Sequence, residues 1–337
     1  MSRHITFIVP GSIETRTGGY EYDRRMIAAL RTRGWTVDIC ELDRHDALPE
    51  VADESIVVVD GLALDSAGAA LEREAARLRV VALVHMPGAS RTDERAPLVA
   101  ARSIVVSGGS AKRALIEDGV EAARITIVEP GTVSAPIARG SLRLASLAQG
   151  GPGAHAVHLL CVATLNALKG HEILLTALTM IPERNWRLTC AGSLSRDPGT
   201  AARVRRMIVD WRLDDRVSLA GESDERALAA RYDSADVFVL ATLSETYGMA
   251  VAEAIARGLP VISTATGEIP RIVGDGGIIV PPGDVDAFAA ALSSVLRDAK
   301  LRERLRDGAK RARLHLRTWD QAGDEMAAAL GRVTSNA

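Results

Sequence analysis

The chain has 337 residues, enough for about two domains of ordinary size. Its 41 lysine and arginine residues are nearly balanced by 43 aspartate and glutamate residues, so no overall positive charge attracts nucleic acid or an anionic membrane. Hydrophobic residues make up 47% of the chain but aromatic residues only 3%, so Ala, Val, Leu and Ile must fill the cores, as is typical of helices packed on parallel strands.

The cysteines and the apolar runs indicate the compartment. Cys40, Cys161 and Cys190 are odd in number and form no CxxC motif, which favours reduced core thiols. No apolar run approaches the ~20 residues of a membrane-spanning helix, and the first run, at 5–10, is too short for the core of a signal peptide. We therefore expect a cytoplasmic protein.

A βαβ unit opens the chain. We expect a strand at 5–9, a polar loop that contains Gly18 and Gly19, a helix at 26–33 and a strand at 35–40. The glycines lack the GxGxxG spacing, which argues against a nicotinamide dehydrogenase. Further elements of the first half are predicted as strands at 55–60, 80–85, 103–107 and 124–128 and a helix at 110–118.

Two of these strands end in residues that can do chemistry. Asp60 ends one strand and His85 ends the next. Ligands of open α/β sheets bind at the carboxyl ends of strands, so both residues are candidates by position. A buried histidine with satisfied hydrogen bonds would give the same pattern at His85.

A stretch rich in glycine and proline at 149–153 is typical of a linker between domains. We predict a first domain at 1–140, a linker at 141–156, a second domain at 157–316 and a final segment at 317–337. The second domain is predicted to hold strands at 158–162, 187–191, 216–219, 237–240 and 260–263 and helices at 172–180, 201–211, 225–232, 249–257 and 285–296.

Alternation of strands and helices throughout predicts two doubly wound α/β domains with mostly parallel sheets. The charged segment 297–317 reads as a solvated helix with i,i+4 ion pairs, with a helix lying on a membrane surface as the alternative. The zinc motif HExxH begins at His171 but has Leu175 at its second histidine position, so we expect no metal there.

The strand-turn-helix at 237–254 is the most informative stretch. Gly248 precedes the predicted helix, and Met249 and Ala250 lie in its first turn. The free backbone N–H groups and the positive end of the dipole make such a helix start a place to bind phosphate. Lys169 follows the first strand of the second domain, where it would meet a phosphate at the same edge, although a plain surface lysine is an alternative.

Two carboxylates flank this helix start. Glu245 lies in the turn and Glu253 on the helix. A carboxylate repels a diphosphate but accepts hydrogen bonds from hydroxyl groups, of which a sugar nucleotide has many. A solvated loop glutamate and a helix glutamate favoured by the dipole would give the same spacing.

Glu245 and Glu253, with seven residues between them in Glu-Thr-Tyr-Gly-Met-Ala-Val-Ala-Glu, resemble the EX7E motif of the family 4 retaining glycosyltransferases. The segment Leu168-Lys169-Gly170-His171 and the Gly18-Gly19 loop are similar to that family as well. The resemblance implies the GT-B fold, in which two Rossmann-like domains face each other across a cleft, and a C-terminal helix that crosses back to the first domain.

The resemblance also implies transfer of a sugar from a nucleotide diphosphate-sugar to a small-molecule or lipid-linked acceptor, with retention and without a metal or other cofactor. By that likeness, Lys169, Glu245 and His85 act in catalysis. The residues that the resemblance assigns to the donor are Gly18, Gly19, Thr164, Lys169, Gly248, Met249, Ala250 and Glu253. Partners from nucleic acid are not expected, and contact with a membrane is possible but not indicated.

The sequence departs from the family pattern in three places. Thr164 stands where the family has a phosphate-binding arginine, and Glu268 and Arg271 replace an expected Gly and Glu. The segment between His85 and Ser103 leaves little room for the helix expected there. The missing arginine leaves open a protein that binds a sugar nucleotide without turnover. A hydrolase or epimerase of the same fold is the other alternative to a transferase.

Overall fold

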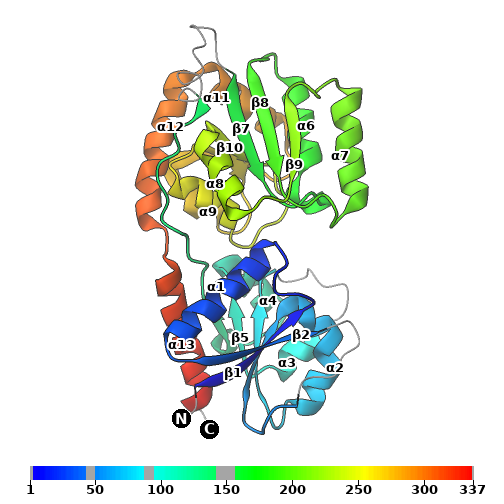
Figure 1. The fold of residues 1–337 in the computed structure, drawn as a ribbon, viewed down its shortest axis with the longest axis vertical. Coiled ribbons are helices and arrows are strands. Elements are labelled where there is room, and N and C mark those ends of the chain that lie inside the picture. The colour runs from blue at the N-terminus through cyan, green and yellow to red at the C-terminus, as the bar shows by residue number, and fades with distance from the viewer. Residues whose placement is uncertain (1–2, 43–49, 87–94, 142–155, 336–337) are drawn as a thin grey trace. The chain divides into compact units, whose positions relative to one another are not determined.

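The computed structural model describes residues 3–42, 50–86, 95–141 and 156–335, and the chain divides into two compact units (Figure 1). Unit 1 comprises Met1–Gly131 and Arg317–Ala337, and unit 2 comprises Thr132–Leu316. Most of the linker predicted at 141–156 lies outside the described residues. Among the described residues, no helix is long and apolar enough to cross a membrane.

Unit 1 is built on a parallel six-stranded sheet with the order β2-β1-β3-β4-β5-β6. The apolar runs predicted as strands form the buried strands, and every residue of β3 is buried. The strands are β1 His4–Pro10, β2 Thr36–Leu42, β3 Ile56–Asp60, β4 Arg79–Val84, β5 Ser103–Val106 and β6 Ile125–Ile127. The helices are α1 Gly18–Thr32, α2 Leu64–Glu74, α3 Arg95–Ala100, α4 Gly109–Glu117 and α13 Trp319–Ser335.

Unit 2 repeats the plan with the parallel order β12-β11-β10-β7-β8-β9. Aspartate side chains at 197, 224, 284 and 298 cap the starts of α7, α8, α11 and α12. The strands are β7 Val157–Val162, β8 Trp186–Ala191, β9 Val217–Gly221, β10 Val237–Leu240, β11 Val261–Thr264 and β12 Gly277–Val280. The helices are α6 His171–Met180, α7 Pro198–Asp210, α8 Glu225–Ser234, α9 Met249–Ala256, α10 Ile269–Val273, α11 Val285–Arg297 and α12 Ala299–Ala312.

The predicted fold class is therefore confirmed: each unit is Rossmann-like. In unit 1 the strand order reverses at β1 and β3, and in unit 2 at β10 and β7. In open α/β sheets a ligand binds at such a reversal, outside the carboxyl ends of the strands. The turns that follow β7 and β10 are thus the place where a ligand of unit 2 is expected.

Helix α1 corrects the first prediction about the glycine pair. We expected a loop through Gly18 and Gly19 and a helix from residue 26, but the helix begins at Gly18. Glu21 stabilises its first turns because it pairs with Arg24 and Arg25 at 2.8 Å each. The buried polar residue Asp23 interrupts the apolar pattern, so the pattern did not predict the first two turns of α1.

Helices α2 and α10 and strand β12 were not predicted, and the segments at 95–100 and 299–312 also differ from expectation. A short helix, α3, does lie between His85 and Ser103, where we expected too little room for one. Helix α12 is not wholly solvated, because Leu305, Gly308 and Ala309 are buried in unit 2. Its exposed side carries an ion pair between Lys310 and Asp307 at 2.9 Å.

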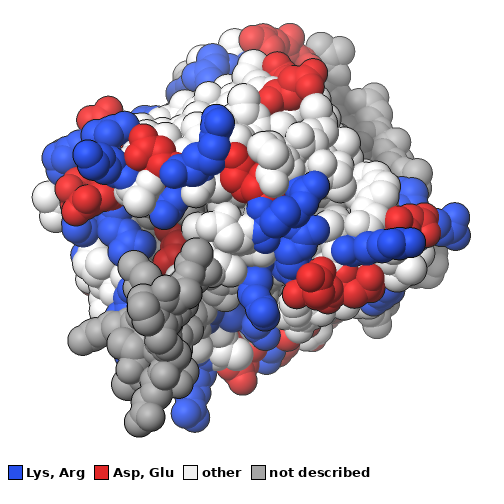
Figure 2. All heavy atoms as spheres, turned by 90° about the horizontal axis from the view of Figure 1, so that it is seen from above, with Lys and Arg blue, Asp and Glu red and all other residues white. Residues whose placement is uncertain are grey.

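Figure 2 shows one face of the molecule, on which basic and acidic side chains are interspersed.

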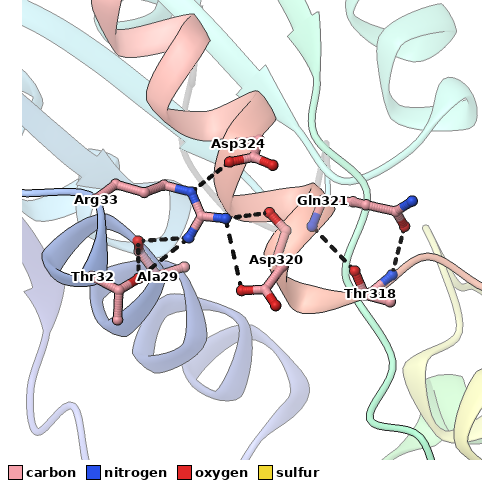
Figure 3. A network of polar contacts seen from close by, with 7 residues as sticks. All are labelled: Ala29, Thr32, Arg33, Thr318, Asp320, Gln321 and Asp324. Atoms are coloured by element: carbon pink, nitrogen blue, oxygen red, sulfur yellow. Dashed lines mark hydrogen bonds and ion pairs between the residues drawn. The ribbon is translucent and has the colours of Figure 1, made fainter.

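Helix α13 packs on α1 within unit 1, although nearly 300 residues separate them. Figure 3 shows how its start is fixed: Thr318 and Gln321 form a reciprocal capping box, with N–H to side-chain distances of 2.9 and 3.2 Å. The guanidinium of Arg33 donates to the Asp320 carbonyl at 2.6 Å and to the Asp324 carboxylate at 2.7 Å. One arginine thus ties the first turns of α13 to the end of α1.

Candidate functional site

The turn between β10 and α9 has the geometry of an anion site. Gly248 caps α9 with φ 95° and ψ 55°, a left-handed conformation that a side chain would strain. A Cβ at this position would also lie 2.8 Å from Cγ1 of Ile269. The glycine lets the chain turn directly into Met249 and Ala250, whose N–H groups have no partner inside the helix. The predicted phosphate-binding backbone therefore starts a real helix.

Lys169 and Glu245 meet in this place. The Nζ of Lys169 donates to Oε1 of Glu245 at 2.5 Å, and both side chains are largely buried, with 17% and 16% exposed. They come from the turns after β7 and β10, which are neighbours in the sheet. Sequence spacing of 76 residues gave no sign of this contact, and only the strand order explains it.

The backbone of the two turns is joined closely. The Leu243 N–H donates to the Leu168 carbonyl at 2.7 Å, and the Thr242 hydroxyl donates to the same oxygen at 3.0 Å. Gly170 has φ 66°, and a Cβ there would lie 1.9 Å from the carbonyl oxygen of Ala241. Gly170 is therefore required for the turn of Lys169 to pack against the end of β10.

Glu253 projects from α9 next to Tyr232. Burial raises the pKa of the Tyr232 phenol well above its ordinary value, and the charge of Glu253 and a hydrogen bond with it act in the same direction. The guanidinium of Arg257 lies 4.5 Å from the centre of the Tyr232 ring. Glu253 is half-buried, its side chain hydrogen-bonds with the Tyr232 phenol, and its backbone carbonyl accepts from the Arg257 guanidinium at 3.0 Å.

The positions that depart from the family pattern are also placed. Thr164 follows β7, and its carbonyl accepts from the Asn166 N–H at 2.9 Å. Arg271 donates to Glu268 at 2.9 Å, so the two substituted charges neutralise each other. The Glu268 N–H donates to the Thr246 carbonyl at 3.1 Å, which braces the turn that carries Glu245.

A second cluster surrounds His85 in unit 1. The Nε2 of His85 lies 3.0 Å from Oδ1 of Asp23 and 3.2 Å from Oδ2 of Asp60. The side chains of Asp23 and Asp60 are 0% and 3% exposed, against 18% for His85. Asp60 ends β3 and also accepts from the Leu62 N–H at 2.6 Å, which fixes its carboxylate.

Charge decides the protonation of this cluster. Burial acts to lower the pKa of His85, but the charge of Asp23 and hydrogen bonds to both carboxylates outweigh it and raise the pKa to about 10. Burial raises the pKa of Asp23 to about 7, although the charge of His85 opposes this. Burial also acts to raise the pKa of Asp60, but the hydrogen bond and charge of His85 lower it. The raised pKa of His85 favours the imidazolium form of the ring at neutral pH.

Gly18 and Gly19 lie in the first turn of α1, beside this cluster. A Cβ on Gly19 would lie 3.3 Å from Cδ2 of His85, so the glycine makes room for the ring. The structure thus brings Gly19 and His85 together in unit 1, and Lys169 and Glu245 together in unit 2. Asp60 was a candidate by position, but Asp23 was missed, because an acidic residue in a helix gives no signal of burial.

Two groups of side chains have ligand atoms within 4.8 Å of one another. One is the His85 cluster, in which Nε2 of His85 lies within 3.2 Å of both carboxylates. The other comprises Cys161, Cys190 and His171, with the Cys161 sulfur 3.7 Å from Nε2 of His171. A buried structural zinc site needs four ligands, and no fourth histidine, cysteine or carboxylate in the described part of the chain joins this group. We assign it to the core.

Comparison with known proteins bears on both units. Residues 153–312 match the family model for glycosyl transferases group 1. The D-inositol 3-phosphate glycosyltransferase of Xylanimonas cellulosilytica is 31% identical over 215 residues, which cover 62% of this chain and 51% of that protein. The enzyme of the same description from Kineococcus radiotolerans is 30% identical over 241 residues, covering 65% and 54%. The chain thus spans about half the length of these curated relatives.

Solved structures resemble the whole chain. Sucrose-phosphate synthase from Thermosynechococcus elongatus has a TM-score of 0.80 at 21% identity and covers 99% of this chain and 100% of its own. Anabaena Alr3699/HepE in complex with UDP-glucose also has a TM-score of 0.80, at 17% identity, covering 98% and 99%. The chain therefore has the GT-B fold, and most of its unit 2 matches the group 1 glycosyl transferases.

Proposed function

We propose that the protein is a retaining glycosyltransferase that uses a nucleotide diphosphate-sugar as donor. The observation that carries the proposal is the Lys169–Glu245 pair, held at 2.5 Å beside the glycine-capped start of α9. It places a cation, a hydroxyl acceptor and free N–H groups at the strand-order reversal of unit 2. The family match over 153–312 and the UDP-glucose complex of a structural neighbour support it.

Each residue has a role that its chemistry permits. Lys169 and the N–H groups of Met249 and Ala250 neutralise the diphosphate, and Gly248 lets it approach the helix start. Glu253 accepts hydrogen bonds from the ribose hydroxyls, and Glu245 accepts them from the transferred sugar. Glu245 compensates the charge of Lys169 in the unliganded protein, so donor binding exchanges one anionic partner of the lysine for another.

The remaining residues belong to unit 1. His85 acts near the sugar and the incoming acceptor, and Gly18 and Gly19 form the first turn of α1 next to it. Thr164 adds no charge, so Lys169 and the helix start carry the diphosphate without the arginine that the family has at that position.

The reaction needs no nucleophile from the protein and no metal in this proposal. The acceptor oxygen bonds to the anomeric carbon on the face from which the diphosphate leaves, and the bond from that carbon to the diphosphate oxygen breaks. The acceptor proton passes to a phosphate oxygen. Lys169 and the start of α9 stabilise the charge that develops on the leaving group, and each preorganised donor contributes about 3 kcal/mol. Attack on the same face retains the anomeric configuration.

We infer a cytoplasmic enzyme with a small polyol phosphate or a lipid-linked acceptor. The small-molecule class is favoured because the relatives are described as acting on D-inositol 3-phosphate. The curated relatives are about twice as long as the matched region, so the acceptor is part of the proposal.

Turnover tests the proposal. Purified protein is incubated with UDP-, GDP- and ADP-sugars and a panel of acceptors that includes inositol phosphates, and the product is examined by NMR. We expect one donor to yield a glycoside with the anomeric configuration of the donor. An inverted product would refute retention, and donor consumption without an acceptor would favour the hydrolase or epimerase alternative. Donor binding without turnover would favour a non-catalytic binding protein.

A further inference from the structure

His85 is held along one edge by two carboxylates from different elements. Asp23 comes from α1 and Asp60 from the end of β3, and both reach the same ring nitrogen, Nε2, at 3.0 and 3.2 Å. One carboxylate suffices to orient a histidine in the familiar catalytic triads. A second, buried carboxylate on the same nitrogen adds negative charge and is not needed to orient the ring. We therefore ask what the additional negative charge does to His85.

We propose that Asp23 and Asp60 are a positioning pair that keeps His85 doubly protonated and turned so that Nδ1–H donates a hydrogen bond to an oxygen of the bound sugar substrate. In this role His85 is a donor and a positive charge, and it is not a base. The inference rests on the proposed transferase function for the identity of the substrate, and on the geometry of unit 1 alone for the charge and orientation of the ring.

The ring contacts leave one edge for a ligand. Nε2 faces the two carboxylates, and the backbone of Gly19 covers the Cδ2 edge, where an added Cβ would lie 3.3 Å away. The Tyr22 ring approaches edge-on with its centre 5.1 Å from that of His85. The Ser107 hydroxyl donates to the His85 carbonyl at 3.3 Å and anchors its backbone. Nδ1 and Cε1 form the opposite edge, and within the described part of the chain Nδ1 makes no hydrogen bond.

Charge balance explains the pair of carboxylates. Two buried carboxylates whose oxygens lie within 4.8 Å of each other repel unless a cation lies between them or one of them takes up a proton, which the raised pKa of Asp23, about 7, allows in part. An imidazolium supplies that cation. If His85 acted as a base it would be neutral before the reaction, and the negative charge of the carboxylates would have no cation beside it. A base must present a lone pair at working pH, whereas this ring keeps both protons, consistent with its raised pKa of about 10.

Among the residues that the structure describes, the other ionisable groups around the cluster do not supply this charge. Tyr22 on α1 is buried, and burial, together with Asp23 and Glu325, raises the pKa of its phenol well above the ordinary value. Glu325 on α13 is paired with Arg317. Ser107 after β5 is neutral. Within the described part of the chain, His85 and its two carboxylates are therefore the groups that set the charge of this cluster near neutral pH.

NMR of 15N-histidine-labelled protein tests the protonation directly. The His85 signals are assigned by their loss in His85→Gln. In the wild type, both ring nitrogens are expected to stay protonated through the range of about pH 6 to 8 in which free histidines titrate. Asp23→Asn and Asp60→Asn replace a carboxylate by an amide of the same shape, and each is expected to bring the His85 titration down into that range. The matched control is Asp38→Asn, which removes the carboxylate of the exposed His4–Asp38 pair in the same unit and leaves the His85 signals unchanged.

Kinetics separates a positioning role from a structural one. We expect each Asp→Asn variant to lose about tenfold or more in kcat with KM within about twofold of wild type, and to lose activity as pH rises through the lowered His85 pKa. Asp23→Glu, which keeps the charge, is expected to recover the wild-type pH profile in part. Asp→Asn variants that remain folded with unchanged kcat and pH profile would overturn the inference.

Three other results are decisive. A wild-type protein that transfers sugar while His85 titrates as a free imidazole overturns the positioning pair and leaves the proposed function intact. A wild-type protein with a doubly protonated His85 that transfers no sugar to any acceptor overturns the proposed function, and with it the role toward a sugar. The metal content of protein purified without chelator is also measured. Stoichiometric metal in the wild type that is lost in both Asp→Asn variants would show that a metal ion, and not a proton on His85, lies between the carboxylates, and would overturn the inference.

Discussion

At the scale of single residues, the two clusters use opposite charge arrangements. In unit 2 one lysine faces one carboxylate, and in unit 1 one histidine faces two. A lysine with a single anionic partner can exchange it for a phosphate, whereas a histidine between two buried carboxylates keeps its proton. The first arrangement suits a residue that binds the leaving group, and the second suits a fixed donor.

The Lys169–Glu245 pair gives the first prediction. Lys169→Ala is expected to lower kcat by about 10² to 10³, because one preorganised charge on the leaving diphosphate is lost. It should also lower the free energy of unfolding, since Glu245 is left largely buried without its cation. Kinetics and denaturant unfolding measure the two effects.

The double variant Lys169→Ala/Glu245→Gln separates them. It is expected to recover much of the stability but none of the activity, while Lys300→Ala, at an exposed lysine on α12, leaves both unchanged. Activity restored in the double variant would contradict the role of Lys169 on the diphosphate.

The His85 cluster predicts how stability depends on pH. The folded pKa of His85 is about 10 against an ordinary value of 6.5, so its stabilisation is complete below pH 6.5 and is lost as pH rises through about 10. Asp23, with a pKa raised from 3.8 to about 7, favours the folded state at low pH and costs stability as pH rises to 7. The free energy of unfolding should therefore fall between pH 7 and 10.

Denaturant unfolding at several pH values measures this dependence. Asp23→Asn is expected to flatten the curve between pH 7 and 10, because the His85 pKa then moves toward its ordinary value. Asp38→Asn should follow the wild-type curve. A wild-type curve that is flat over this range, or one that Asp23→Asn does not change, would contradict the assigned charges.

At the scale of elements, α13 shows how a helix can be held by small residues. Gly323 faces α1, and a Cβ there would lie 2.7 Å from Cβ of Ala29 and 2.9 Å from Nη1 of Arg33. The same arginine carries the hydrogen bonds to Asp320 and Asp324 shown in Figure 3. Gly323 therefore allows the two helices to approach closely, and it also leaves room for the Arg33 guanidinium.

A pair of glycine variants in α13 tests this coupling. Gly323→Ala should destabilise the protein by about 1–3 kcal/mol, since the added methyl forces α13 away from α1 and strains the Arg33 network. Gly331→Ala lies in the same helix with open space around the added Cβ, and is expected to be neutral or stabilising by up to about 1 kcal/mol. Thermal unfolding compares them, and equal effects of the two substitutions would show that Gly323 is not a packing contact.

The elements also show what the sequence predicted and what it could not. The apolar strands were predicted well, because a buried parallel strand is a short continuous run such as Val237 to Leu240. Helix starts were less certain: α7 begins at Pro198 behind the Asp197 cap, before the apolar pattern at Ala201 becomes visible. The prediction for α1 was too short because Asp23 is a polar residue on the buried face of the helix.

The candidate site divides in the same way. A motif carried Glu245, Gly248 and Glu253, since they are close in sequence on one strand-turn-helix. The contact between Lys169 and Glu245 depends on β7 and β10 being neighbours, which periodicity does not reveal. The role of Asp23 depends on burial against His85, and a helix aspartate gives no sign of burial from sequence alone.

At the scale of the whole molecule, both units use one plan: a parallel sheet whose strand order reverses, with chemical groups in the turns beyond the reversal. Unit 2 carries most of the match to the group 1 glycosyl transferases, and the GT-B fold extends over the full chain. Unit 1 contains the histidine cluster and also includes α13, from the far end of the chain. The central claim is that unit 2 binds a nucleotide diphosphate-sugar at the start of α9.

Calorimetry with UDP-, GDP- and ADP-sugars tests that claim most directly. The wild type should bind one nucleotide, Glu253→Ala should bind it at least about tenfold more weakly because the ribose hydroxyls lose their acceptor, and Glu303→Ala, at an exposed glutamate on α12, should bind it as the wild type does. Binding of none of the donors, or equal binding by the wild type and Glu253→Ala, would contradict the account.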